Sequence, residues 1–147
     1  MKVFLAADHA GYGAKEALKK ALIEKGYEVD DKGAHSFDPG DDYPGFMKAA
    51  AEGVLQNPGS RAFLFGGSGQ GEAMVANRHR GIRAAVYYGG QKDLITLSRE
   101  HNDANVLSFG ARFMTTNAVI EAAFLWLDTK FSGIERHRRR IAVIDEM

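Results

Sequence analysis

Short apolar runs alternate with amphipathic stretches along the chain. The runs have the length and composition of buried strands and cover residues 3–7, 27–31, 62–65, 82–87 and 106–109. Apolar residues at helical spacing follow each run, over residues 14–25, 44–56, 70–78, 91–100 and 116–128. Five strands, each followed by a helix, predict an α/β fold, a Rossmann-like three-layer αβα sandwich with a five-stranded parallel sheet.

The order of the strands decides where a ligand binds in such a sheet. We expect the common order 2-1-3-4-5, in which the strand order reverses between strands 1 and 3. Ligands of doubly wound sheets bind outside the carboxyl ends of the strands at that reversal. Strand 1 ends at Asp8-His9, and strand 3 ends at the glycine-rich tract 66–72. The topology therefore predicts that these two polar turns meet in one crevice.

Composition narrows the class of protein further. At 147 residues the chain predicts one domain, residues 1–147, without an internal linker. The 19 basic and 19 acidic residues balance to a net charge of zero, which argues against nucleic acid and membrane as general partners. Cysteine is absent, which excludes disulfides, thiol catalysis and thiolate zinc sites. The apolar run 3–7 meets Asp8 too early for a secretory signal, and we expect a cytoplasmic protein.

The tract Gly66-Gly67-Ser68-Gly69-Gln70-Gly71-Glu72 departs from the familiar glycine motifs. A P-loop needs lysine after its last glycine, where this chain has Glu72, and a dinucleotide fingerprint needs a different glycine spacing. A nucleophile elbow needs glycine where Gln70 stands. One alternative is purely structural, a tight turn that packs the helix on the sheet, with Ser68 as its cap.

A carboxylate beside exposed backbone amides indicates proton transfer next to a carbonyl group. The Glu72 carboxylate would repel a phosphate but is suited to abstract a proton from carbon. Amides at a glycine turn and helix N-terminus stabilise the oxygen that becomes negative. Asp8 and His9 would face this turn from strand 1, although Asp8 alone is equally typical of a helix N-cap.

Basic residues near the end of the chain are candidates for binding an anion. A basic helix is predicted over residues 134–144, and it places Arg136 and Arg140 on one face, where both could hold one phosphate. Arg112, after strand 5, is a third candidate. A run of this kind is otherwise a solvated face or a nucleic-acid patch, which the neutral net charge disfavours.

The tract His101-Asn102-Asp103 raises a geometric question. It follows the fourth helix, which returns the chain to the amino end of the sheet, away from the predicted crevice. By default these are loop residues that cap the turn into strand 5. If they are catalytic, we expect them to act in the site of a neighbouring subunit, which would make the protein an obligate oligomer.

Seven tracts together resemble type B ribose-5-phosphate isomerases, a family that also holds the galactose-6-phosphate isomerase subunits. The resemblance covers essentially the whole chain in order. The tracts are Ala7-Asp8-His9-Ala10-Gly11, Asp42-Tyr43-Pro44, the glycine tract 66–72, Ala76-Asn77-Arg78, Gly81-Ile82-Arg83-Ala84, residues 98–107 and Arg136-His137-Arg138-Arg139-Arg140.

The resemblance implies a role for each matching residue. Some members use a cysteine at the position of Gly66 as the base, and this chain resembles the branch in which the glutamate matching Glu72 takes that role. Ser68 and the amides of residues 69–71 would stabilise the enediolate, Asp8 would shuttle protons between the sugar oxygens, and His101 would assist ring opening. The residues implied in substrate binding are His9, Tyr43, Gly67, Gly69, Gly71, Asn102, Arg112, Arg136 and Arg140.

The resemblance implies an aldose–ketose isomerase that interconverts ribose 5-phosphate and ribulose 5-phosphate. It also implies a homodimer or homotetramer with sites shared between subunits, and no metal or organic cofactor. Other substrates stay open, among them allose or galactose 6-phosphate and erythrulose 4-phosphate, as does a non-catalytic subunit that only binds sugar phosphates. A nucleic-acid-binding module based on the arginine run is the remaining alternative.

Overall fold

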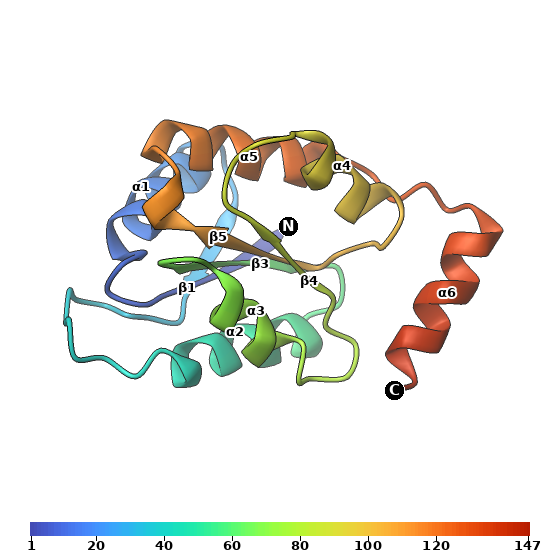
Figure 1. Ribbon diagram of the computed structural model, residues 1–147, viewed down its shortest axis with the longest axis horizontal. Coiled ribbons are helices and arrows are strands. Elements are labelled where there is room, and N and C mark those ends of the chain that lie inside the picture. The colour runs from blue at the N-terminus through green and yellow to red at the C-terminus, as the bar shows by residue number, and fades with distance from the viewer.

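The computed structural model describes residues 1–147 and confirms a parallel sheet covered by helices on both faces (Figure 1). The strands are β1 (Lys2–Ala7), β2 (Glu28–Asp31), β3 (Arg61–Gly66), β4 (Ala84–Tyr87) and β5 (Val106–Gly110). The helices are α1 (Tyr12–Glu24), α2 (Pro44–Gln56), α3 (Gln70–Ala76), α4 (Asp93–Glu100), α5 (Thr116–Asp128) and α6 (Glu135–Asp145), with a short 3-10 turn, η1 (Ala111–Phe113). Each element lies within a few residues of its predicted range. No helix combines the length and apolar character needed to cross a membrane.

Alternation along the strands builds two apolar cores, one on each face of the sheet. In β1, Val3 and Leu5 point to the core beneath α1, α4 and α5, while Phe4 and Ala6 point to the core beneath α2 and α3. The first core is aromatic, with Phe63 and Trp126 at 5.2 Å between ring centroids. The second contains five alanines among its 11 buried residues. Figure 1 shows the two helical layers above and below the strands.

The strand order is β2-β1-β3-β5-β4, so the expected order 2-1-3-4-5 was wrong in its last two strands. The reason lies in burial. Every residue of β5 is buried, and the strand needs neighbours on both sides, whereas most residues of β4 are only half-buried, as suits an edge. The Asn105 side chain holds the two strands together, accepting from the Arg83 N–H at 2.8 Å and donating to the Gly81 carbonyl at 2.8 Å. The reversal of strand order still lies between β1 and β3.

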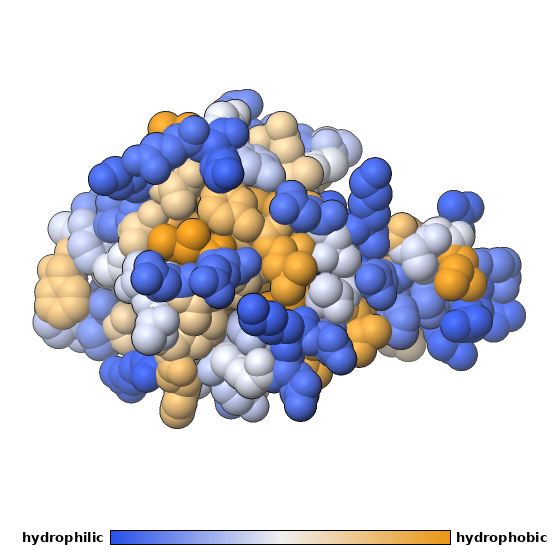
Figure 2. All heavy atoms as spheres, turned by 90° about the horizontal axis from the view of Figure 1, so that it is seen from above, coloured by the Kyte–Doolittle hydropathy of each residue, from blue (hydrophilic) through white to orange (hydrophobic).

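Helix α6 projects from the body at the amino end of the sheet. Figure 2 shows it as a mostly hydrophilic arm. Its contacts with the body are few: Asp145 accepts two hydrogen bonds from Arg83 at 2.7 and 2.8 Å, and the buried His137 pairs with the Ser132 hydroxyl at 2.8 Å. The ring of His137 also packs against His101, with 4.4 Å between centroids. All four arginines of the helix are exposed.

Candidate active site

The carboxyl ends of β1 and β3 bring the two predicted polar turns together. Ala7 and Phe65 are partners in the parallel ladder, and the Asp8 N–H donates to the Phe65 carbonyl at 3.0 Å. Gly11 packs directly on Phe65, where a side chain would collide with its backbone. The two turns therefore lie side by side where the strand order reverses, as the topology predicted, and we call the space between them the crevice.

The glycine turn between β3 and α3 is held by residues on both sides. Gly69 caps α3 with φ of +77°, a left-handed conformation, and a Cβ there would lie 2.8 Å from the Phe109 backbone. The fully buried Ser108 hydroxyl donates to the Gly69 carbonyl at 2.6 Å. Ser68 accepts from the Gln70 N–H at 3.3 Å within the turn, but Gly69 and not Ser68 is the N-cap of α3, which has no side-chain capping bond. Sequence reasoning missed Ser108, although it is the one hydroxyl in an otherwise apolar strand.

Glu72 lies in the first turn of α3 and is only 4% exposed. Its carboxyl group lies against Gly66, in the space where a side chain at residue 66 would be. Burial raises the pKa of Glu72 above its ordinary value, against a hydrogen bond from its own backbone N–H. The charge of Asp8 and a hydrogen bond between the two side chains raise this pKa further. Perturbation of this kind is typical of a group that exchanges protons.

Asp8 is held by the turn that precedes α1. Its Oδ1 atom accepts from the Gly11 N–H at 2.8 Å, but Gly11 is the N-cap of α1 and no side chain caps that helix, so the N-cap interpretation of Asp8 was wrong. The same carboxyl group interacts with Glu72 across the crevice. The turn contact holds Asp8 in place, so its side chain is positioned before any ligand arrives.

Three further predicted residues border this crevice. The Tyr43 hydroxyl lies against Gly71, so closely that a side chain at residue 71 would collide with it. The Arg112 guanidinium covers Gly67, at 3.2 Å from the position of a Cβ there. His9 lies 3.6 Å from a carboxylate that sequence reasoning missed, Asp41. The structure thus gathers Asp8, His9, Tyr43, Gly67, Ser68, Gly69, Gly71, Glu72 and Arg112.

The remaining predicted residues lie at the opposite end of the same chain. His101 follows α4, Asn102 is exposed beside it, and Arg136 and Arg140 lie on α6. Desolvation lowers the pKa of His137, and the neighbouring His101 and both arginines lower it further. This second cluster therefore has the positive potential that an anion requires, but β3 and β5 separate it from Glu72 (Figure 1).

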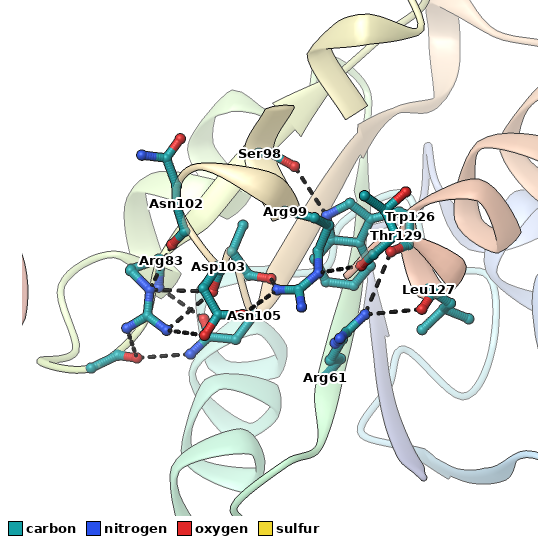
Figure 3. Close-up of polar contacts among 12 residues, drawn as sticks. Arg61, Arg83, Ser98, Arg99, Asn102, Asp103, Asn105, Trp126, Leu127 and Thr129 are labelled. Carbon is teal, nitrogen blue, oxygen red and sulfur yellow. Dashed lines mark hydrogen bonds and ion pairs between the residues drawn. The ribbon is translucent and has the colours of Figure 1, made fainter. Parts of the chain in front are cut away.

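Arg83 and Arg99 hold the loop that carries His101 and Asn102, while Arg61 donates to the carbonyls of Trp126 and Leu127 at the end of α5; we call these three residues the arginine brace (Figure 3). Arg83 donates to the Asn102 carbonyl at 3.0 Å, and Arg99 donates to the Asp103 carboxylate at 2.7 Å. Burial, and then the charge of Arg99, lower the pKa of Arg61 to about 10. Arg83 and Arg99 thus tie this loop to the segment before β4 and to the end of α4.

The structure shows no metal centre, and its cavity beside α6 lies away from Glu72. No group of three or more histidine or acidic side chains is arranged to hold a metal ion. A cavity of about 460 Å³ lies between the segment 77–85 and the end of α6, and its lining includes the predicted residue Asn102 together with Ile144 and Met147. Its lining includes neither Asp8 nor Glu72, so it is separate from the two polar turns.

Comparison with known families places the chain in one of them. A model of the family described as Ribose/Galactose Isomerase matches residues 3–144. The chain belongs to this family. Ribose-5-phosphate isomerase B of Mycobacterium tuberculosis is 39% identical over 146 residues, which are 99% of this chain and 89% of the relative.

Solved structures of ribose/galactose isomerases have the same fold. The ribose 5-phosphate isomerase of Thermotoga maritima is 38% identical, with a TM-score of 0.91 over 99% of this chain and 98% of that one. Ribose-5-phosphate isomerase B of Mycoplasma genitalium, solved with bound ribulose-5-phosphate, is 35% identical. Its TM-score is 0.93 over 99% of this chain and 94% of that one.

Proposed function

We propose that this protein interconverts ribose 5-phosphate and ribulose 5-phosphate through an enediolate, with Glu72 as the base. The observation that carries the proposal is the buried Glu72 carboxyl beside the glycine turn at the start of α3. A carboxyl with a raised pKa takes a proton from carbon and returns it more readily near neutral pH. The amides of the turn favour the oxygen that becomes negative.

The proposed steps are proton transfers on the open-chain sugar. Glu72 removes the C2 proton, the electrons of that bond form the C1–C2 double bond, and the aldehyde oxygen becomes the enediolate oxygen. The Ser68 hydroxyl and the amides of residues 69–71 stabilise that oxygen. Glu72 then returns the proton to C1, while Asp8 carries the O2 proton to O1. A carbonyl remains at C2, and the steps use no metal or organic cofactor.

The relatives support a five-carbon substrate. The Mycoplasma genitalium structure holds ribulose-5-phosphate, and it aligns with 99% of this chain. The Mycobacterium tuberculosis relative is named for the same activity. We therefore propose a five-carbon sugar phosphate as the substrate of this chain. Because the depth of the pocket decides which sugar length fits, sugars of different length test this proposal.

We also propose that two subunits complete each site, in a homodimer or homotetramer. His101, which would assist ring opening, and Asn102 lie at the opposite end of the chain from Glu72. Arg136 and Arg140 are exposed on the projecting α6, where they could reach the crevice of a neighbouring subunit. Arg112 and His9 would then meet the same phosphate from within the chain that holds Glu72.

A panel of sugar phosphates with four, five and six carbons tests the proposed function. Wild-type protein should isomerise ribose 5-phosphate fastest, and Glu72→Gln should lower kcat about a thousandfold. Glu52→Gln, at an exposed glutamate of α2, is the matched control and should keep full activity. Retained activity in Glu72→Gln would rule out Glu72 as the base. Faster turnover of a four- or six-carbon sugar would reassign the substrate.

A further inference from the structure

Two buried polar groups at the crevice have no hydrogen-bond partner. The Asp41 side chain is 7% exposed, and neither of its carboxylate oxygens accepts a hydrogen bond. The Nδ1 atom of His9 is buried and unpartnered as well. These two groups face each other, with 3.6 Å between His9 Nδ1 and Asp41 Oδ1. Each is therefore the nearest candidate partner for the other.

Such a pair is unusual because unpartnered buried groups are costly. A buried carboxylate without a hydrogen bond loses its hydration and gains nothing in return. Asp38, in the same loop, shows the ordinary arrangement, since it is exposed and its Oδ1 accepts from the Gly40 N–H at 2.9 Å. Asp41, in contrast, makes no side-chain hydrogen bond that would stabilise the loop, and it lies beside His9. This position indicates a role in the site.

The surroundings of His9 determine which edge of its ring is available. The Phe37 ring packs edge-on against it, with 6.2 Å between centroids, and the Nδ1 edge is turned inward toward Asp41. A third of the His9 side chain is exposed. The edge that carries Nε2 is thus the one that a ligand can reach. An acceptor on Nδ1–H determines which ring nitrogen carries the proton and how the ring is oriented.

We propose that Asp41 is a positioning residue for His9. Its carboxylate accepts a hydrogen bond from the Nδ1–H of His9, so that Nε2 faces the phosphate of the sugar substrate. The distance of 3.6 Å is slightly longer than a hydrogen bond. Hydrogen bonds of this kind often tighten only when the substrate binds. The inference rests on the proposed function, because it takes His9 as a phosphate-binding residue. It adds Asp41, which acts through His9 and touches no reacting atom.

Kinetics of Asp41 variants provide the first test. Asp41→Ala should raise KM for ribose 5-phosphate about tenfold and change kcat less than about twofold. Asp41→Asn keeps a side-chain oxygen as acceptor, so its KM should rise only about threefold. Asp38→Asn is the control, because it removes the same charge from the same loop while keeping the acceptor for Gly40. An unchanged KM in Asp41→Ala overturns the proposal.

A double mutant separates action through His9 from a direct contact with the sugar. In a His9→Gln background, Asp41→Ala should raise KM by less than about twofold, because the ring that it orients is gone. A tenfold rise in that background overturns the proposal, since Asp41 would then act independently of His9. Circular dichroism of each variant identifies loss of folding.

Nitrogen-15 NMR of the histidine rings gives a readout that does not depend on activity. The His9 signals are assigned by their loss in His9→Gln. With inorganic phosphate added, wild-type His9 should carry its proton on Nδ1, and Asp41→Ala should shift the tautomer population toward Nε2. An identical tautomer population in both proteins overturns the proposal. Lack of isomerase activity in wild-type protein would instead count against the proposed function, and the NMR result would still decide the role of Asp41.

Discussion

The carboxyl group of Glu72 occupies the space in which a side chain at Gly66 would lie. A Cβ built on Gly66 would overlap both carboxylate oxygens and the carbon between them. Gly66 ends β3 and Glu72 lies in the first turn of α3, so the strand makes room for a side chain of the helix that follows it. The absence of a side chain at residue 66 thus positions the proposed base.

Gly66→Ala should therefore impair catalysis more than binding. The added methyl group would displace the Glu72 carboxyl, and a shift of about 1 Å in a reacting group costs about a hundredfold in rate. We expect kcat to fall by about that factor with KM nearly unchanged. Steady-state kinetics measure both. Gly13→Ala is the matched control, because a Cβ there meets no atom within 4 Å. Full activity in Gly66→Ala would show that Glu72 can act from another position.

Glu72→Gln should stabilise the protein while it removes activity. The raised pKa means that the folded state favours the protonated carboxyl, so the contribution of Glu72 to stability is fully present below the ordinary pKa of glutamate and is lost as pH rises through the higher folded-state pKa. Glutamine carries no charge at any of these pH values, so the variant does not lose the stability that ionisation of the buried Glu72 carboxyl costs the wild type. At pH 8 the variant should melt about 3 °C above wild type, and the difference should vanish near pH 4. Thermal melts across this range measure it, and a constant difference would contradict the assignment.

Mixing two inactive variants should restore activity if sites are shared between subunits. Glu72→Gln and His101→Ala remove groups from opposite ends of the chain. In a mixed dimer, one site receives both wild-type groups and the other receives neither. Random exchange of subunits should then recover roughly one quarter of wild-type activity. Assays after refolding the two variants together measure this. If mass spectrometry shows hybrid dimers in the mixture and no activity is recovered, Glu72 and His101 do not act together from different subunits.

Arg83 couples α6 to the loop before β5, and two variants separate these contacts. Arg83→Ala removes the bonds to Asp145, Asn102 and Asp103 and should cost about 2 to 3 kcal/mol of stability. Asp145→Ala removes only the contact with α6, at a partly exposed pair, and should cost about 0.5 to 1 kcal/mol. Urea unfolding measures both values. Equal costs would mean that Arg83 contributes little through the loop.

The fold was predictable where neighbours in the chain determine it. The first strand alternates between two apolar faces, Gly26 ends α1 with φ of +88°, and Pro44 begins α2. The positions of β4 and β5 depend instead on contacts distant in sequence. An apolar run predicts a strand, but its degree of burial decides whether it lies at the centre or the edge, and that is a property of the whole sheet.

Some residues of the site were likewise predictable from the sequence, and others were not. Asp8, Glu72 and Tyr43 lie together because they follow or precede elements whose topology was predictable. Asp41 carries no signal of its own, since a second aspartate beside Asp42 in a polar loop is typical of a solvated turn. Only the packing of that loop shows that one of the two is buried against His9 and the other is exposed.

Two residues of the arginine brace also lie against the single tryptophan of the chain. Trp126 is fully buried, its indole N–H donates to the Ser98 hydroxyl at 3.1 Å, and the guanidinium groups of Arg61 and Arg99 lie 5.3 and 5.6 Å from its ring. Its fluorescence therefore comes from one well-defined environment at the amino end of the sheet. Emission will follow the opening of that end during unfolding, and it will be insensitive to a ligand in the crevice of the same subunit. The protein thus carries an intrinsic optical probe that distinguishes loss of structure from occupancy of the site.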